Sequence, residues 1–468
     1  MSDTLMISVS GIRGLVGKDL TPEMVARWAA AFGVWSRERG AGGRKRVAVV
    51  LGRDARTSGP MFAQAATAGL NSVGCDVIDV GLVATPTVQL AVEHHRAAGG
   101  IILTASHNPI EWNALKFVGP DGIFLDTVAG TRLRELAAGE ALPRANYNAI
   151  GGVEADSDAI ARHLAAVLAL KTVDVRTIRR RRFRVALDTV RGAGGAVMPE
   201  LLERLGCRVT AINLETDGLF PRPPEPVPEN LKALGALVRR TKADIGIAVD
   251  PDVDRLAIVD EKGRPIGEDY TLAFAVRAVL GRADGRMGRR AVVCNLSTSL
   301  VVEDAAKEFG AKIVRAPVGE AHVARTIIGL NAVIGGEGNG GVMYPALHVG
   351  RDAPVGAALI LSLLARERVT VSAVVARAPR YTIVKAKQEL GGGSREPGKF
   401  EAIYVELRRR FPEAAADTQD GLRLAWSDRW LHVRPSGTEP IIRLIAEAPT
   451  GADAERLIDE GRRLCAAS

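Results

Sequence analysis

The feature that most constrains the fold of this chain is a pattern that occurs three times. In each copy an apolar run leads into a loop with a polar residue, a helical stretch follows, and a Gly-x-x-Val/Ile step opens another apolar run. The copies span residues 47–77, 184–209 and 291–313. Apolar runs separated by a helix of about 15 residues are typical of strand–helix–strand units. The repeat therefore predicts three similar α/β domains, each with a mixed sheet and flanking helices.

The last part of the chain has a different pattern of apolar runs. Short β-rich runs at 381–387, 422–426, 430–433 and 441–448 come before a closing helical stretch at 452–466. This order predicts a separate α+β domain. Turn-rich stretches mark the expected boundaries. We therefore expect four domains, at residues 1–147, 148–259, 260–369 and 370–468.

Composition excludes several classes of protein. Hydrophobic residues make up 47% of the 468 residues and charged residues 25%, the balance of an ordinary folded protein. The four cysteines form no Cys-x-x-Cys pair. We therefore expect neither a disulfide framework nor a zinc ribbon, and we expect a reducing compartment, the cytoplasm. No apolar stretch approaches the roughly 20 residues of a membrane span. We therefore expect no membrane partner.

The net charge of +8 raises the question of nucleic acid as a partner. Only 4% of the residues are aromatic, and the basic cluster at 179–182 is short. Binding of single strands needs aromatic stacking beside basic grooves, and duplex binding needs a broader basic face. We expect no nucleic-acid partner and interpret the excess charge as steering for small anions.

Polar clusters follow apolar strands at four places, and the first is residues 104–109, Thr-Ala-Ser-His-Asn-Pro. Substrate-facing groups of open α/β sheets collect at strand ends, so Ser106 is a candidate nucleophile, and an ordinary turn is the alternative. His107 does not complete a catalytic triad, because adjacent residues rarely meet side chain to side chain and the chain has no Gly-x-Ser-x-Gly elbow here.

The second cluster holds Asp250, Asp252 and Asp254 and follows the apolar run 245–249. Carboxylates at i, i+2 and i+4 of an extended chain point to one side, where they repel one another unless a hard cation lies between them. Mg²⁺ is the natural occupant. An EF-hand needs glycine where this chain has Arg255. A solvated acidic turn is the remaining alternative, but apolar runs flank the cluster on both sides.

The third and fourth clusters are suited to sugar and phosphate. Residues 335–341 form a glycine-rich turn without the Gly-Lys-Ser/Thr of a P-loop, and Glu337 within it would accept two neighbouring sugar hydroxyls. Residues 434–440, Arg-Pro-Ser-Gly-Thr-Glu-Pro, offer a guanidinium, hydroxyls and turn amides that would cradle a phosphate. A simple turn is the alternative for each.

Together the four clusters resemble the motifs of the α-D-phosphohexomutases. That family has a Thr-Ala-Ser-His-Asn-Pro phosphoserine loop, an Asp-x-Asp-x-Asp-Arg magnesium loop, a Gly-Glu-x-Ser/Asn-Gly sugar loop and an Arg-Pro-Ser-Gly-Thr-Glu-Pro phosphate loop. All four occur here in the family's order, and the resemblance spans essentially the whole chain. It implies four domains around a central cleft, with a last domain similar to the TATA-binding protein fold.

The resemblance also implies the chemistry. Ser106 would pass a phosphoryl group to a sugar phosphate, and the bisphosphate formed would turn round and return its other phosphate, so that hexose 6-phosphate and 1-phosphate interconvert. Catalytic amounts of sugar 1,6-bisphosphate would prime the enzyme, and Mg²⁺ would be held by the three aspartates and an oxygen of phosphorylated Ser106. The further site residues implied are Arg13, Lys116 and Arg255 at the reacting phosphate, Glu337 and Asn339 at the sugar, Arg434, Ser436, Gly437 and Thr438 at the distal phosphate, and His107 and Asn108 beside the serine.

Two departures from the family pattern bear on the sugar. The phosphomannomutase/phosphoglucomutase branch usually has Ser-Gly-His where this chain has Asn339-Gly-Gly341, and a Gly-His pair near residues 318–323. The Val-Gly-Glu-x-x-Val pattern here is more similar to phosphoglucosamine mutases, whose substrate has a C2 ammonium that Glu320 would meet. We expect glucosamine phosphate, with mannose or glucose phosphate as the alternative. The general acid/base stays unassigned, with Glu320 and His322 in the relevant loop.

Two other classes of function use the same residues. A metal-dependent sugar phosphatase needs no second phosphate site, so the loop at 434–440 argues against it. A non-catalytic sugar-phosphate sensor would tolerate loss of the serine or of an aspartate, and none is missing. The expected partner is a small sugar phosphate. The oligomeric state is left open between monomer and homodimer.

Overall fold

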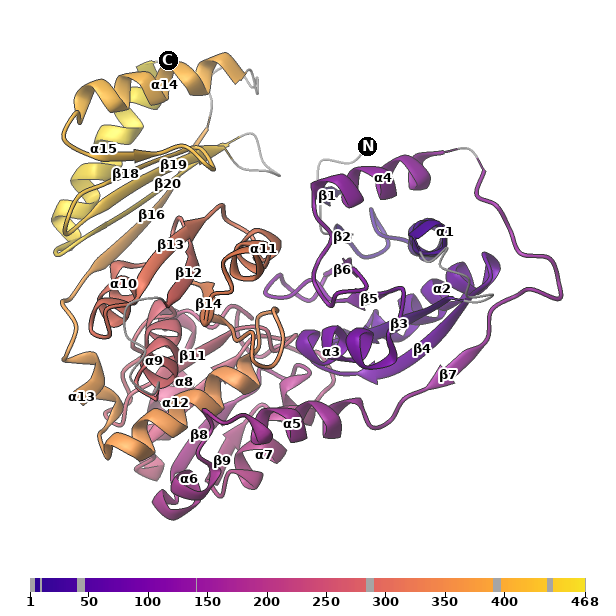
Figure 1. The fold of residues 1–468 in the computed structure, drawn as a ribbon, viewed down its shortest axis with the longest axis horizontal. Helices are drawn as coiled ribbons and strands as arrows, with labels where there is room; N and C mark the ends of the chain where they lie inside the picture. Colours follow the sequence, from indigo (N-terminus) through magenta and orange to yellow (C-terminus); the bar gives the residue numbers. More distant parts are fainter. Residues whose placement is uncertain are drawn as a thin grey trace.

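In the computed structural model the chain forms four domains arranged around a cleft (Figure 1). The structure describes residues 5–8, 11–39, 47–139, 141–282, 290–389, 397–435 and 441–467. Within these ranges no helix is long and apolar enough to cross a membrane.

The first domain is built on one large sheet. Its elements are β1 (Met6–Ser8), β2 (Gly11–Leu15), α1 (Pro22–Arg39), β3 (Val47–Arg53), α2 (Gly59–Ser72), β4 (Cys75–Leu82), α3 (Thr85–His95), β5 (Gly99–Leu103), β6 (Trp112–Val118), α4 (Thr127–Ala138) and β7 (Val153–Ala155). The strand order is β1-β2-β6-β5-β3-β4-β7. Every residue of β5 is buried, because helices cover both faces: α1, α2 and α4 share one apolar cluster, and α3 belongs to another. The sheet runs past the boundary expected after residue 147, since β7 pairs in parallel with β4.

The second and third domains each have a four-stranded sheet. The second domain contains α5 (Ala159–Ala169), α6 (Val175–Arg181), β8 (Arg184–Asp188), α7 (Gly194–Arg204), β9 (Arg208–Ile212), the 3-10 turn η1 (Pro228–Asn230), α8 (Lys232–Thr241), β10 (Ile245–Val249) and β11 (Leu256–Val259). The third contains α9 (Asp269–Leu280), β12 (Ala291–Asn295), α10 (Leu300–Lys307), β13 (Lys312–Ala316), α11 (Glu320–Leu330), β14 (Ile334–Glu337), β15 (Gly341–Met343) and α12 (Ala353–Glu367). The helix of the third repeat, α10, is shorter than expected, because the chain leaves the helix for a turn at Phe309 and Gly310.

The three repeats give the same four-stranded arrangement. The orders are β6-β5-β3-β4, β11-β10-β8-β9 and β15-β14-β12-β13, each with three parallel strands and one antiparallel strand beside them. The strands that open and close each sequence repeat pair in parallel, β3 with β4, β8 with β9 and β12 with β13. Three of the four polar clusters occupy the equivalent connection, between the third parallel strand and the antiparallel strand. The sequence repeat therefore explains why three chemically different loops come from corresponding positions.

The second and third domains share one hydrophobic core. A single cluster of buried side chains runs from α5 and α7 through α9 to α12. Helix α12 is buried over almost its whole length, which accounts for the most apolar stretch of the sequence. The first domain and the last have apolar clusters of their own. The two middle domains are therefore one packing unit.

The last domain is α+β, as expected. It contains β16 (Thr382–Glu389), α14 (Pro397–Arg410), β17 (Ala415–Asp417), β18 (Leu422–Ala425), β19 (Trp430–Pro435), β20 (Ile441–Ala448) and α15 (Gly451–Ala467). Its antiparallel sheet has the order β16-β20-β19-β18-β17. The short helix α13 (Val371–Val375) comes before this domain and packs on the core shared by the second and third domains. The sequence analysis missed α14, although Phe400, Ile403, Tyr404 and Leu407 have the spacing of an apolar helix face and pack on the core of this domain. The expected fold class is confirmed.

Candidate functional site

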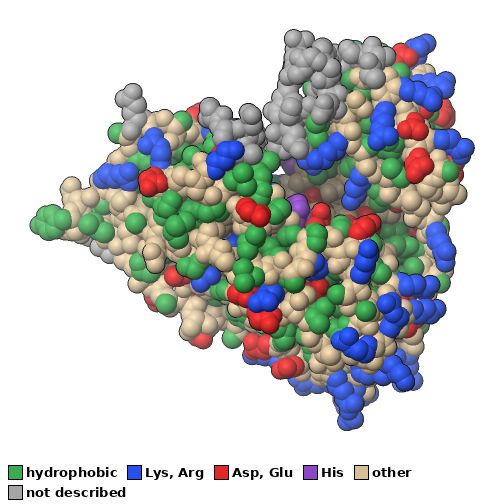
Figure 2. Space-filling view, turned by 180° about the vertical axis from the view of Figure 1, so that it is seen from behind, with side chains coloured by type: hydrophobic (Ala, Val, Ile, Leu, Met, Phe, Trp, Pro, Cys, Tyr) green, Lys and Arg blue, Asp and Glu red, His purple; other side chains and the backbone are tan. Residues whose placement is uncertain are grey.

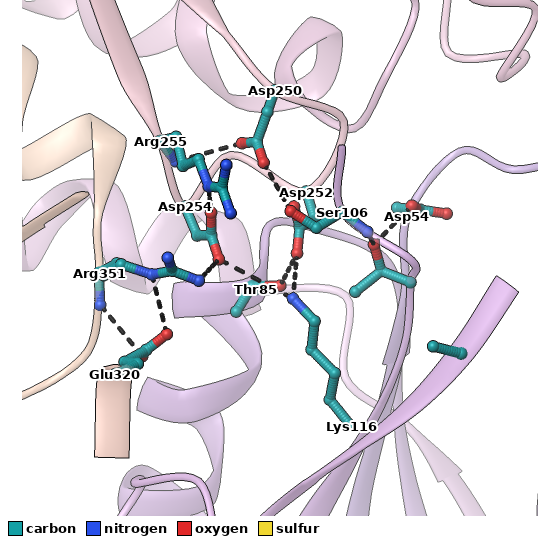
Figure 3. Close-up of polar contacts among 12 residues, drawn as sticks. Asp54, Thr85, Ser106, Lys116, Asp250, Asp252, Asp254, Arg255, Glu320 and Arg351 are labelled. Carbon is teal, nitrogen blue, oxygen red and sulfur yellow. Dashed lines mark hydrogen bonds and ion pairs between the residues drawn. The ribbon is translucent and has the colours of Figure 1, made fainter. Parts of the chain in front are cut away.

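Ser106 lies in the loop between β5 and β6 and points at the metal loop of the second domain. Its backbone is left-handed, with φ of 49°. Its amide donates to Oγ1 of Thr104 at 2.9 Å, and that hydroxyl donates to Oδ2 of Asp54 at 2.7 Å. The Ser106 side-chain oxygen then lies 2.9 Å from Oδ2 of Asp250 (Figure 3). Local turn geometry therefore aims the candidate nucleophile at the aspartate cluster.

Arg56, which the sequence analysis did not single out, holds the serine loop in place. Its guanidinium is fully buried and pairs with Asp54. It donates to four backbone carbonyls of the loop and the strand that follows, those of Ser106, Asn108, Pro109 and Trp112. A left-handed serine in a loop without regular structure needs such support. The available signal was Asp54, the partner of Arg56 two residues earlier, which comes directly at the end of an apolar strand.

The three aspartates lie between β10 and β11, and their burial is complete. One carboxylate oxygen from each lies within 4.8 Å of the others. The loop is a tight turn and not the extended chain that the sequence analysis assumed, because Val253 adopts a φ of 62°. The carboxylates converge all the same. A β-branched residue in this conformation is strained, so the surrounding packing must impose the turn.

The electrostatics of this cluster fit a divalent cation. Burial raises the pKa of Asp250, and the neighbouring charges of Asp252 and Asp254 raise it further. Oδ1 of Asp252 and Oδ1 of Asp254 are buried and have no hydrogen-bond partner. Buried carboxylate oxygens without donors are costly, and oxygen ligands are what Mg²⁺ prefers. The aspartates therefore have the donor atoms, the burial and the excess negative charge of a magnesium site.

Cations and a hydroxyl from the first domain contact the same cluster. Nζ of Lys116, on β6, lies 2.7 Å from Oδ2 of Asp252 and 3.8 Å from Oδ2 of Asp254. Thr85, at the start of α3, donates to the same Asp252 oxygen at 2.8 Å. Burial would raise the pKa of Asp252, but Lys116 and these hydrogen bonds hold it below its usual range. Thr85 is a second contact that the sequence analysis missed.

The two arginines expected at the reacting phosphate line the same cavity as Ser106. Nη1 of Arg13, on β2, donates to Oδ1 of Asn108 at 2.6 Å. Arg255 anchors the metal loop through its backbone amide, which donates to Oδ1 of Asp250, and its guanidinium pairs with Glu225 at 3.0 Å. Both guanidinium groups are therefore held beside the serine.

His107 also lines the cavity, and the cations around it keep it neutral. The charge of Arg255, burial, and the charges of Arg13 and Lys116 lower its pKa to about 2. Its Nδ1 is buried without a hydrogen-bond partner. A neutral imidazole adds no repulsion toward the three cations that surround it.

Glu337 ends β14 in the third domain and is held by several donors. Oε1 accepts from Nδ2 of Asn295 at 2.9 Å and from the amide of Gly319 at 3.1 Å. Nδ2 of Asn339 lies 3.5 Å from Oε2. Gly319 has a φ of 129°, a conformation that residues with a Cβ rarely adopt. Oε2 also accepts from Nη1 of Arg351 at 3.0 Å, so donors fix both oxygens of this carboxylate at the wall of the cavity.

Glu320 is buried and paired, which changes the expectation that it meets a substrate ammonium directly. Its Oε2 accepts from Nε of Arg351 at 3.0 Å, and its Oε1 accepts from Gln89 and from the Arg351 backbone. Arg351 also contacts Glu337 and Asp254. The sequence analysis missed Arg351, which lies in the Gly-Arg-Asp tripeptide at 350–352. His322, two residues after Glu320 on α11, also lines the cavity.

Arg434 comes from β19 of the last domain and faces the same cavity. Its Nε lies 3.1 Å from a carboxylate oxygen of Asp420, which also accepts from the amide of Val318. Ser436, Gly437 and Thr438, predicted to share its phosphate site, lie outside the described residues. Asp420 therefore connects the last domain to the loop that precedes Glu320, and Arg434 pairs with it.

All four domains contribute to one cavity of about 1000 Å³. Figure 2 shows a recess between the first and last domains, with histidine and acidic side chains visible inside it. Basic side chains of the last domain line its far side: Lys385, Lys387, Arg434 and Arg443. The cavity is thus lined by Ser106, which contacts the buried aspartate cluster, and by these basic side chains of the last domain.

Comparison with known proteins gives matches along the whole chain. Models of the phosphoglucomutase/phosphomannomutase alpha/beta/alpha domains I, II and III match residues 5–142, 161–263 and 267–381, and the C-terminal domain model matches 394–464. A phosphoglucomutase/phosphomannomutase of Thermococcus kodakarensis is 39% identical over 97% of both chains. A probable phosphoglucosamine mutase of Methanopyrus kandleri is 37% identical over 96% of this chain and 95% of its own.

A solved structure is similar over the same length. The crystal structure of a phosphoglucomutase/phosphomannomutase family protein from Burkholderia thailandensis has a TM-score of 0.82 at 28% identity. The match covers 99% of this chain and 98% of that chain.

Proposed function

The chain belongs to the phosphoglucomutase/phosphomannomutase family, and on that premise we propose that it interconverts glucosamine 6-phosphate and glucosamine 1-phosphate through a phosphorylated Ser106. The predicted membership in the phosphohexomutases is confirmed by matches to all four family domains and by the curated relatives. The enzyme is therefore an isomerase. The proposal concerns the identity of the sugar and the roles of single residues.

One observation carries the mechanism: a buried serine hydroxyl lies 2.9 Å from an aspartate of a three-carboxylate cluster, in a cavity whose opposite wall is basic. A phosphatase needs the first half of this arrangement only. An enzyme that moves phosphate between two ends of one sugar needs both halves, because one end must be held while the other reacts. The extra basic wall therefore supports the mutase over the phosphatase.

In this proposal Ser106 carries the phosphoryl group and passes it to the free hydroxyl of the bound sugar phosphate. Arg13, Arg255 and Lys116 lie around the serine and supply fixed positive charge to the equatorial oxygens during transfer. Mg²⁺ held by the three aspartates and an oxygen of phosphorylated Ser106 would supply further charge neutralisation. The Arg56 clamp keeps the serine loop rigid, so that these charges lie at fixed positions when transfer occurs.

The basic wall of the last domain would hold the phosphate that is not reacting. Arg434 offers a guanidinium there, which binds phosphate through two parallel hydrogen bonds where geometry allows. A sugar bisphosphate that turns round in the cavity presents C1 and C6 in turn to Ser106, and the same wall serves both orientations. A primer of sugar 1,6-bisphosphate would load the serine in the first cycle.

The charge of the sugar-facing cluster favours an amino sugar. With both carboxyl groups ionised, Glu320 and Glu337 would carry two negative charges against the one positive charge of Arg351, so these three buried groups would have a net charge of −1. Burial raises the pKa of Glu320, and a nearby cation would favour its ionised form. A C2 ammonium would neutralise that charge, whereas the hydroxyl of glucose or mannose would not. Because Arg351 already pairs with Glu320, the ammonium would interact with the cluster as a whole.

Mannose or glucose phosphate is the second candidate substrate. The relative from Thermococcus kodakarensis is named phosphoglucomutase/phosphomannomutase, and it aligns with 97% of this chain. The probable phosphoglucosamine mutase from Methanopyrus kandleri aligns over a similar length. Overall similarity therefore does not separate the two substrates, and the local charge is what supports the amino sugar in this proposal.

The substrate is tested by turnover with the 6-phosphates of glucosamine, mannose and glucose in parallel, primed with the matching bisphosphate. We expect kcat/KM to be highest for glucosamine 6-phosphate. A neutral sugar with the highest kcat/KM would overturn the glucosamine assignment and leave the mutase reaction standing.

A further inference from the structure

Arg351 is the one described side chain in Figure 3 that contacts both the metal loop and the sugar-facing carboxylates. It directly precedes Asp352, whose side chain caps α12, and its backbone bridges to Met343. The cap and the bridge fix the backbone from which the guanidinium extends. Its side chain is about 10% exposed, at the wall of the cavity.

Each nitrogen of the guanidinium contacts a different carboxylate. Nη2 lies 2.6 Å from Oδ2 of Asp254, Nε lies 3.0 Å from Oε2 of Glu320, and Nη1 lies 3.0 Å from Oε2 of Glu337. Asp254 belongs to the second domain, and both glutamates belong to the third. Lysine could not reproduce this arrangement, because its donors share one atom and cannot reach three carboxylates in one plane.

The contact with Asp254 bears on which of its oxygens would be left for an ion. Arg351 occupies Oδ2, and Lys116 approaches the same atom, so Oδ1 is left buried without a hydrogen-bond partner, 3.7 Å from Nε of Arg255. The contact with Glu337 acts in a similar way on the sugar side, because Arg351 and the donors to Oε1 together fix the plane of that carboxylate. One guanidinium thus orients a metal-facing oxygen and a sugar-facing oxygen.

We propose that Arg351 is a positioning residue that couples the metal loop to the sugar loop, so that Mg²⁺ affinity and sugar-phosphate affinity both depend on it. The sugar half of this statement rests on the proposed role of Glu337. Glu320 acts as the third anchor that keeps the guanidinium in the plane of the other two carboxylates. Its pairing with Arg351 accounts for a buried glutamate beside two other acids.

The test measures binding and not only turnover. Arg351→Met keeps the approximate side-chain volume and removes the charge, and Arg351→Lys keeps the charge and removes the planar fork. Titration calorimetry gives the Kd of Mg²⁺ for the unphosphorylated protein and, with EDTA present, the Kd of glucosamine 6-phosphate. In Arg351→Met we expect the Kd of Mg²⁺ to rise roughly 10- to 100-fold and that of the sugar phosphate about 10-fold. Arg351→Lys should show smaller rises in both.

A matched control separates positioning from general loss of a buried ion pair. Arg277 is also buried in the third domain and pairs with Glu308, but it does not line the cavity. Arg277→Met should lower the melting temperature and leave both dissociation constants unchanged. A circular dichroism melt shows whether Arg351→Met folds. If it does not, the two dissociation constants of Arg351→Lys test the coupling.

Folded Arg351 variants with both affinities unchanged, or with only one weakened, would overturn the coupling. Failure of the proposed substrate gives a different result: the wild-type protein would bind Mg²⁺ but not glucosamine 6-phosphate. In that case the same titrations with mannose 6-phosphate measure the sugar half of the coupling.

Discussion

The hydroxyl of Ser106 lies 2.9 Å from Oδ2 of Asp250, although 144 residues separate the two in the chain. The serine comes from the first domain and the aspartate from the second, and both lie in the connection between a buried parallel strand and the antiparallel strand that pairs with it. Repetition of one α/β unit therefore produces a site with different chemistry in each copy. The predictions below depend on this arrangement.

Replacing Ser106 by alanine should lower kcat at least ~10³-fold, because no other group in the cavity can replace a covalent phosphoryl carrier. Intact-mass analysis of the wild-type protein after incubation with bisphosphate should show a phosphate adduct that is absent from the variant. Ser72→Ala, on the surface side of α2, is the control and should keep the adduct. An alanine variant at position 106 with normal turnover would exclude the covalent role.

The carboxylate cluster makes turnover dependent on a divalent cation. EDTA should abolish activity and Mg²⁺ should restore it, and Asp252→Asn should weaken Mg²⁺ binding in calorimetry. The fold should survive this change, because the cluster loses repulsion together with a ligand. Asp244→Asn, at a surface ion pair of the same domain, should leave Mg²⁺ binding unchanged. Full activity in EDTA would refute the metal assignment.

Arg56 should control the rigidity of the serine loop. Arg56→Lys keeps the charge but loses most of the donors that contact the four carbonyls of the loop. We expect kcat to fall roughly 10- to 100-fold with little change in Mg²⁺ affinity, because Arg56 does not contact Asp250, Asp252 or Asp254. Hydrogen exchange of the amides in residues 104–112 should become faster. Unchanged exchange in a variant with reduced kcat would mean that Arg56 acts by another route.

The shared core makes a prediction about unfolding. Leu359 of α12 is fully buried in the cluster that spans the second and third domains. Leu359→Ala should lower the free energy of unfolding by about 2–5 kcal/mol. Because the two domains share this cluster, calorimetry should show one transition for both, moved to lower temperature. The exposed Leu330 supplies the control, and Leu330→Ala should change stability little. Two separate transitions, of which only one moves to lower temperature, would argue against a common core.

The fold class and the positions of the four site loops could be predicted from the sequence, because both depend on local patterns. The three repeats predicted three α/β domains, and strand ends predicted where polar loops meet. Arg351 and Thr85 could not be found in this way, since their importance lies in contacts with aspartates of another domain. The role expected for Glu320 was incomplete for the same reason: its partner is far along the chain. The residues after Arg434 in the phosphate loop remain a prediction.

The distal phosphate site should serve both isomers. Arg434→Ala removes a charge-assisted contact worth about 1.5 to 3 kcal/mol, or roughly 10- to 150-fold in affinity. Calorimetry should show similar losses for the 1-phosphate and the 6-phosphate, because each sugar places its phosphate at Arg434 in one orientation. Arg429→Ala, on the same domain, should affect neither. Loss of affinity for one isomer only would refute the turning intermediate.

The central claim is that phosphate passes from Ser106 to the sugar and back without reaching water. It is tested most directly in a single turnover of enzyme labelled with ³²P on Ser106 and mixed with unlabelled glucosamine 6-phosphate and Mg²⁺. The account predicts that the label leaves the protein, appears first in a sugar bisphosphate and then in sugar monophosphate, with the protein phosphorylated again by unlabelled phosphate. Label that appears chiefly as inorganic phosphate, or that stays on the protein, would contradict it.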